Sequence, residues 1–282
     1  MKSLLVPVDD SDAMAPVFDL ALAFAKRFNS QIDGVALRPV FTEIVAPDPI
    51  VAVPIPPADW NESAFLQATR QRFEAYFDAK GVRRAPANPK GLSDAPQSYW
   101  HHGTMADDGF IGAQARVYDA VVLGRPVAGG ASPRMNTLES VLFDSGRPIL
   151  MAPPQAPASL GEHVLIAWNK STETARAAAV ALPLLAAAQK VTVLTVENET
   201  VTGPPASALV RYLALQGIEA EEVHRTQGGR KPGATILATA HERGCDLIVK
   251  GAYTTSRLRQ MIFGGPTSHL LAAADIPVFL DD

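Results

Sequence analysis

Two adjacent glycines, Gly264 and Gly265, stand directly before a segment with the composition of a helix. Glycines that open a helix leave backbone N–H groups bare, and the helix dipole adds partial positive charge at the same end. The loop that leads to them starts at Gly251 and contains Arg257 and Arg259, whose guanidinium groups can pair with an anion. These residue types suit phosphate binding. The alternative is that the glycines only allow a loop and a tight helix start.

The elements that must position this loop occur twice along the chain. In each copy an apolar run ends in a polar group and a hydroxyl residue, and a helix-like segment and a second strand-like run follow. In the first copy the apolar run is 3–8, the polar and hydroxyl residues are Asp9 and Ser11, the helix-like segment is 13–28 and the second strand-like run is 31–37. In the second copy the same four parts are 164–168, Asn169 and Ser171, 175–188, and 190–196. Strands that lead into helices and then into strands predict parallel βαβ units.

The ends of the two copies match as well. Residues 118–125 parallel residues 245–252, and each run is strand-like and broken by a glycine, Gly124 or Gly251. A proline then opens the last strand of each copy, where no ladder hydrogen bond is needed. The internal repeat therefore predicts two domains of the same α/β class.

The predicted domains comprise residues 1–152 and 161–282, and a proline-rich linker separates them. The first domain carries additional segments. They are a proline-rich loop at 39–57, a longer helix at about 60–80, and a stretch at 82–97 that we expect to be mostly loop. The second domain is shorter, with helices expected near 207–216 and 233–243.

These features together resemble a tandem universal stress protein. The family carries a loop of the form G-x-x-G, nine residues, then G-[ST], and an aspartate after the first strand that contacts a nucleotide. Gly251 matches the first glycine of that loop and Gly264 the third. The sequence departs from the pattern at three positions. Thr254 replaces the second glycine, Gly265 replaces the hydroxyl residue, and Asn169 replaces the aspartate.

The resemblance implies a fold and a mode of assembly. It implies two tandem open sheets of five parallel strands with helices on both faces, a Rossmann-like fold of the adenine nucleotide α-hydrolase type. Domains of the family pair through their last strands, so residues 148–151 and 277–280 are expected to meet within the chain. The monomer would then be an intramolecular pseudo-dimer, and a further homodimer is compatible with it.

The resemblance also implies a ligand, ATP or ADP, at the carboxyl ends of the strands, where open parallel sheets bind ligands. Mg²⁺ is not expected, because the amide of Asn169 lacks the charge that helps to hold this ion. The candidate ligand-binding residues are Asn169, Ser171, Val196, Gly251, Thr254, Ser256, Arg257, Gly264, Gly265 and Thr267. A possible second site in the first domain comprises Asp9, Ser11 and Gly124, although Met135 there occupies the position of Gly264.

Composition argues against several other classes. The formal net charge of −4 does not suit nucleic-acid binding. The single cysteine, Cys245, permits no internal disulfide and is expected to be a buried, inert thiol. The longest apolar stretch, 177–188, is too short to span a membrane, and the short apolar run before Asp9 is not expected to act as a secretory signal. We therefore expect a cytoplasmic protein that binds neither nucleic acid nor membrane.

Other site chemistries lack support in the sequence. The neighbours His101 and His102 point to opposite faces if they lie on a strand, so we expect a surface or half-buried pair and no metal site. The phosphate-binding motifs G-x-G-x-x-G after a strand and G-x-x-x-x-G-K-[ST] are missing from the sequence.

Three functions remain open. The first is a stress-response factor, not an enzyme, that binds an adenine nucleotide or another small anion in the second domain and acts through conformation or partners. The second is a weak adenine-nucleotide hydrolase that uses the Gly251 loop, for which no general base is identified. The third is an interaction scaffold without a small ligand.

Overall fold

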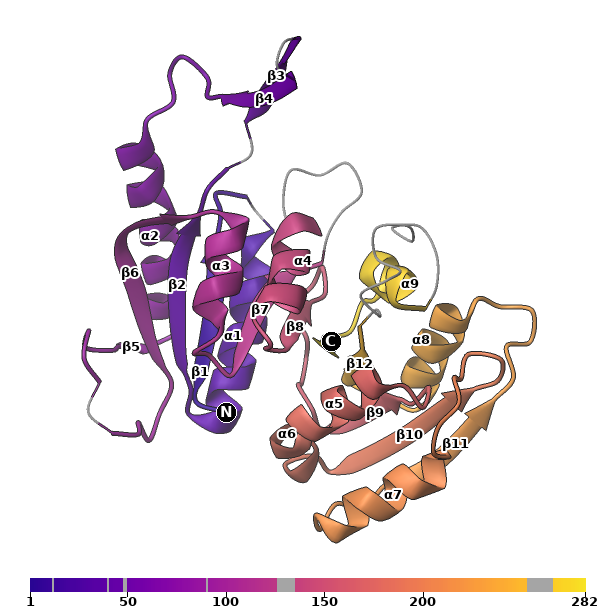
Figure 1. Cartoon of the computed structure of the whole chain (residues 1–282). Coiled ribbons are helices and arrows are strands. Elements are labelled where there is room, and N and C mark those ends of the chain that lie inside the picture. Colours follow the sequence, from indigo (N-terminus) through magenta and orange to yellow (C-terminus); the bar gives the residue numbers. More distant parts are fainter. Residues whose placement is uncertain (12, 40, 48–49, 90, 126–134, 253–265) are drawn as a thin grey trace.

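The computed structural model describes residues 1–11, 13–39, 41–47, 50–89, 91–125, 135–252 and 266–282. Figure 1 shows the chain as two α/β halves placed side by side. The first half contains β1 (Ser3–Val8), α1 (Met14–Phe28), β2 (Gln31–Leu37), β3 (Thr42–Pro47), β4 (Ile50–Ile55), α2 (Glu62–Ala79), β5 (Arg83–Arg84), β6 (Gln97–Ala106), α3 (Asp108–Ala115), β7 (Ala120–Gly124), α4 (Met135–Asp144) and β8 (Ile149–Ala152).

The second half repeats this order with fewer additions. It contains β9 (His163–Ala167), α5 (Thr172–Val180), α6 (Leu182–Ala186), β10 (Lys190–Val196), α7 (Ala206–Leu215), β11 (Glu221–Arg225), α8 (Pro232–Glu242), β12 (Leu247–Gly251), α9 (Pro266–Ala273) and β13 (Val278–Asp281). Between β8 and β9 the chain forms neither helix nor strand.

Apart from β3 and β4, the described strands of both halves join in one 11-stranded sheet with the order β11-β10-β9-β12-β13-β8-β7-β1-β2-β6-β5. Within each half the main strands follow the order third, second, first, fourth, fifth, and neighbouring strands are parallel. The short strand β5 adds an edge to the first half. The expected α/β class and the five parallel main strands per half are therefore confirmed. The two open sheets that the resemblance implied are joined into one, because the last strands β8 and β13 pair with each other.

The two halves meet at the last strand of each. Strands β8 and β13 are antiparallel, and Phe279 pairs with Leu150 in the middle of this seam. Because each last strand finds a partner in the other half, neither presents an open edge to solvent. This pairing was expected from the family resemblance, and the register confirms it.

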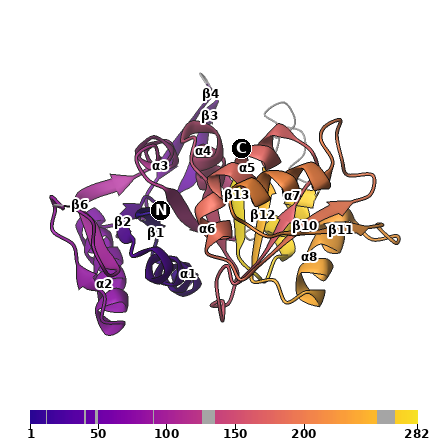
Figure 2. The same cartoon turned by 90° about the horizontal axis from the view of Figure 1, so that it is seen from below.

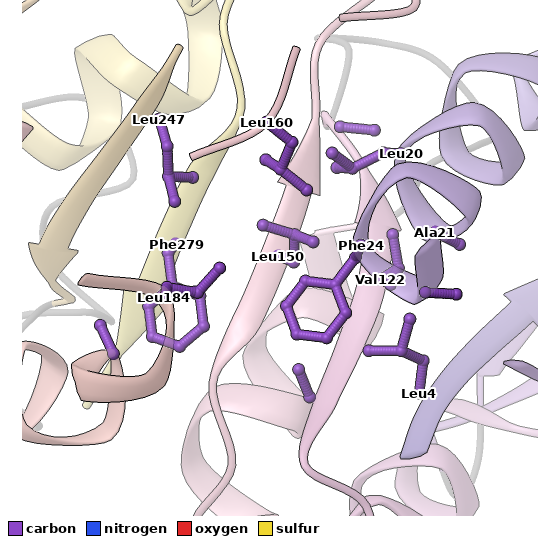
Figure 3. Packing of buried hydrophobic residues seen from close by; sticks show 14 of the residues in the cluster. Leu4, Leu20, Ala21, Phe24, Val122, Leu150, Leu160, Leu184, Leu247 and Phe279 are labelled. Atoms are coloured by element: carbon purple, nitrogen blue, oxygen red, sulfur yellow. The ribbon is translucent and has the colours of Figure 1, made fainter. Parts of the chain in front are cut away.

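Helices cover both faces of the sheet, as the view from below shows in Figure 2. On one face the buried side chains come from α1, α2, α5, α6 and α7, and on the other from α3, α4, α8 and α9. Each of these two buried clusters contains residues of both halves. Figure 3 shows Phe24 of α1, Leu150, Leu160 and Phe279 in the cluster that crosses the seam. The hydrophobic core is therefore continuous from one half to the other.

An ion pair also links the halves. The Arg27 guanidinium at the end of α1 lies 2.7 Å from Glu162 Oε1 and donates a hydrogen bond to the Gly161 carbonyl oxygen at 2.9 Å. The Arg27 side chain is largely buried. Its contacts fix the segment that leads into β9 against the first half.

Two sequence predictions about elements were wrong. Residues 39–57, expected to be a loop, contain the antiparallel hairpin β3–β4, which stands away from the main sheet in Figure 1. The single helix expected at 175–188 is two helices, α5 and α6, which meet at Ala181. Pro183 accounts for the break, because its ring removes a backbone donor and fits only the first turn of a helix.

None of the described helices combines the length and the apolar character that crossing a membrane requires.

Candidate functional site

The carboxyl ends of β9, β10 and β12 lie next to one another in the second half. The chain leaves β9 toward β10 on one side and later returns to β12 on the other, so the strand order reverses at β9. This is the position where open parallel sheets bind ligands. A cavity opens there, and its lining residues are Ala167, Trp168, Asn169, Leu194, Val196, Glu199, Ile236 and Lys250. We call this cavity the crevice.

Lys250 is the most unusual residue of the crevice. It lies inside the apolar strand β12, only 5% of its surface is exposed, and its ammonium donates a hydrogen bond of 3.0 Å to the Gly251 carbonyl oxygen. None of the ion pairs among the described residues involves it. Burial lowers the pKa of Lys250 to about 8, and the negative charges of Glu199 and Glu173 oppose this shift.

Glu199 brings a carboxylate to the same cavity from the segment that follows β10. Its side chain is half-buried. Burial raises the pKa of Glu199, and the ammonium of Lys250 acts in the opposite direction. Among the described residues, the crevice therefore holds one cation and one acid, which form no ion pair with each other, within mainly apolar walls.

Asn169 and Ser171 start α5. The Asn169 side-chain oxygen accepts hydrogen bonds from the Thr174 hydroxyl at 2.6 Å and from the Ser171 N–H at 3.2 Å. The Ser171 hydroxyl oxygen accepts the Thr174 N–H at 3.2 Å and so caps the helix. Asn169 still lines the crevice, but part of its hydrogen-bonding capacity is used within the protein.

Gly251 ends β12 directly against the first turn of α5. A Cβ atom built on Gly251 would lie 2.3 Å from the Thr174 backbone nitrogen and 2.6 Å from the Glu173 carbonyl carbon. Backbone atoms cannot move aside as a flexible side chain can. Glycine at this position is therefore required for the close contact of strand and helix.

The family model of the universal stress protein family matches residues 161–280. This range contains every described wall residue of the crevice. Residues 161–280 are a universal stress protein domain. No curated protein sequence matches the chain.

Solved structures extend the likeness to the whole chain. A universal stress protein from Archaeoglobus fulgidus DSM 4304 superposes with a TM-score of 0.68 at 16% identity, over 99% of this chain and 96% of the other. A functionally unknown protein from Pseudomonas aeruginosa PAO1 superposes with a TM-score of 0.54 at 13% identity, over 100% of this chain and 92% of the other. At such identities the likeness concerns the fold alone. Both halves therefore have the universal stress protein fold.

In the universal stress protein domain the structure brings part of the predicted ligand set together. Asn169 and Val196 line the crevice, and Ser171 and Gly251 lie at its α5 side. Thr267 is buried in the first turn of α9. The remaining predicted residues, Thr254, Ser256, Arg257, Gly264 and Gly265, lie outside the described residues.

The possible second site has a different character. Asp9 Oδ1 accepts a hydrogen bond of 2.8 Å from the Ser11 N–H, so these two residues form a turn between β1 and α1. Gly124 ends β7 and is half-buried, and Met135 begins α4. Whether these residues bind a ligand stays a prediction.

Sequence reasoning missed Lys250, Glu199 and Trp168. The signal for Lys250 was present, because it is the one charged residue in the run from Leu247 to Gly251 that reads as a strand buried on both faces. A charged side chain in such a strand needs a partner or a function. Glu199 and Trp168 carry no comparable signal, because Glu199 lies in a polar stretch and Trp168 ends an apolar run in which an aromatic residue is unremarkable.

The histidine pair is partly exposed and the cysteine is buried, as the sequence predicts. His102 is exposed, whereas His101 is half-buried with its Nε2 atom 3.0 Å from both Asp33 Oδ2 and the Tyr118 hydroxyl. Cys245 is buried, and burial raises the pKa of its thiol to about 12. Among the described residues, no group of three His, Cys, Asp or Glu side chains is arranged to hold a metal ion.

Proposed function

We propose that this protein is a stress-response factor that binds a small anionic ligand, in the first place an adenine nucleotide, in the crevice of its C-terminal half. The observation that carries the proposal is the position of the crevice at the reversal of the strand order, together with its wall of apolar side chains and a few polar ones. Ligand sites commonly combine these properties. Membership of residues 161–280 in the universal stress protein family supports the stress-response role.

Binding, with an effect through conformation or partners, is favoured over catalysis. The Asn169 oxygen at the crevice already accepts hydrogen bonds from the start of α5. The protonated amine of Lys250 has no lone pair with which to accept a proton from water. A hydrolase would need a general base within reach of a water molecule. Among the described residues, Glu199 is the acid that lines the crevice.

The test starts with mass spectrometry of small molecules released from the purified full-length protein. Thermal unfolding and calorimetric titration with ATP, ADP and AMP follow. A ligand at one hundred times its Kd is expected to stabilise the folded chain by about 2.7 kcal/mol. Asn169→Ala should weaken binding about fivefold, because one hydrogen bond contributes about 1 kcal/mol. The matched control is Asn136→Ala, which removes an exposed amide in the other half.

The other functions predict different results. A scaffold without a ligand shows no released molecule and no stabilisation by any nucleotide. A hydrolase shows steady turnover of ATP that Asn169→Ala changes and Asn136→Ala does not. Either result would contradict the proposal.

A further inference from the structure

The buried ammonium of Lys250 has few partners within the part of the chain that the structure describes. An ammonium has three N–H donors, and the Gly251 carbonyl oxygen accepts from one of them. The two acids that act on it, Glu199 and Glu173, do not occur with it among the ion pairs of the described residues. Burying a charge without a partner is unfavourable, and such charges concentrate at functional sites.

The side chain points into the crevice. Ile248, two residues earlier in β12, packs on the side of the sheet covered by α8 and α9. Because side chains alternate along a strand, Lys250 lies on the same side, where Ile236 of α8 forms the opposite wall. The unused donors are therefore positioned at the cavity.

Asn169 adds no charge to the cavity. Its neutral amide lines the same cavity as Lys250. An aspartate there would place a negative charge beside the ammonium. The neutral amide leaves the charge of Lys250 available to a group that comes from outside.

The size of the space limits what can reach Lys250. The cavity has a volume of about 20 Å³, which is enough for a group similar in size to a water molecule. The space at Lys250 therefore admits the oxygens of a carboxylate or a phosphate, and the remainder of a larger ligand would lie outside this space.

We infer that Lys250 determines the specificity of the crevice, and that its ammonium binds a compact acidic group, a carboxylate or a phosphate, at the inner end of the ligand. This inference rests on the proposed function, because it concerns the same cavity. The pKa of about 8 is consistent with it, since Lys250 is then mainly charged at neutral pH.

The experiment compares the full-length protein with Lys250→Met, a variant of similar side-chain length without the charge. Lys190→Met is the matched control, because Lys190 is exposed at the start of β10, at the opposite end of that strand from the crevice. The probes are ATP, adenosine, pyrophosphate and oxalate, measured by calorimetric titration and thermal unfolding. Adenosine shares the base and sugar of ATP but has no acidic group.

Lys250→Met should bind ATP at least tenfold more weakly than the unchanged protein and should bind adenosine equally well. It should also lose the thermal stabilisation by pyrophosphate or oxalate, whereas Lys190→Met keeps all of these properties. Ligand-free Lys250→Met should unfold at the same temperature as the unchanged protein or higher, because it removes a buried charge. Lys250→Gln provides a second neutral variant with a polar end.

The outcomes separate the two proposals. If the unchanged protein binds ATP, and Lys250→Met and Lys250→Gln bind ATP with an affinity within twofold of it, the role of Lys250 is refuted and nucleotide binding stands. If ATP and adenosine do not bind but a small acid stabilises the protein only when Lys250 is present, the nucleotide is refuted and the role of Lys250 stands. If no acid distinguishes the variants from the unchanged protein, the inference is wrong.

Discussion

At the scale of single residues, Gly251 and Asn169 show that one position can serve structure and ligand binding at once. The absence of a side chain at Gly251 lets β12 touch the first turn of α5, and the Asn169 oxygen accepts the Thr174 hydroxyl proton in that same turn. Both positions were predicted from their possible contact with a nucleotide. Their internal contacts are sufficient to explain the residue types present, so the ligand must be tested separately.

Gly251→Ala should lower the free energy of unfolding by about 2–3 kcal/mol, because the added methyl group would overlap backbone atoms of α5. The measurement is urea unfolding followed by circular dichroism. Gly244→Ala is the control, since Gly244 has a φ of +65° and open space around it. The free energy of unfolding of that variant should fall by about 1 kcal/mol through backbone strain alone. Equal losses of unfolding free energy in the two variants would contradict the close contact between Gly251 and α5.

At the scale of elements, the start of α5 connects helix stability to the crevice. Ser171 caps the helix, and Asn169 accepts from two groups of the same turn. Helix α5 in turn packs on β12, where Lys250 lies. A change in the cap is therefore expected to reach both the stability of the helix and the shape of the cavity.

Ser171→Ala should lower the free energy of unfolding by about 1 kcal/mol, the usual contribution of a capping hydroxyl. The comparison variant is Asn61→Ala. The Asn61 side-chain oxygen caps α2 by accepting the Ala64 N–H at 2.9 Å, so this variant should lose a similar amount of unfolding free energy. Thermal and urea unfolding measure both losses. If ligand binding weakens in Ser171→Ala and not in Asn61→Ala, the cap acts on the crevice. A loss for Asn61→Ala alone would contradict the capping role of Ser171.

At the scale of the whole molecule, the two halves behave as one body in the sheet and in the core. The seam pairs β8 with β13, Phe279 and Leu150 belong to one buried cluster, and Arg27 reaches Glu162 across the boundary. A boundary that crosses a continuous core does not separate two independently stable units. The two halves are expected to fold and unfold together.

Scanning calorimetry of the full-length protein should therefore show a single unfolding transition, with equal calorimetric and van't Hoff enthalpies. Phe279→Ala should lower the stability of the whole chain by about 3–5 kcal/mol. Phe24→Ala, in the other half, should move the same transition. Two resolved transitions, of which each variant moves only one, would show that the halves are independent.

The sequence by itself determined the repeat, the α/β class and most of the elements. The predicted strands 31–37 and 190–196 coincide with β2 and β10, because apolar runs bounded by polar residues carry a strong local signal. The hairpin β3–β4 was missed because Pro47 and Pro54 suggested a loop. A two-stranded ribbon tolerates proline, since each strand has an edge that needs no donor.

Only the tertiary structure decided how the crevice is built. Lys250, Glu199 and Asn169 lie far apart in the sequence and meet because the order of the strands places β9 beside both β10 and β12. Burial, which sets the pKa of Lys250, depends on helices that pack from elsewhere in the chain. Local sequence patterns record which residues prefer a strand, whereas the distance between charges and their exclusion from water arise only when the chain has folded.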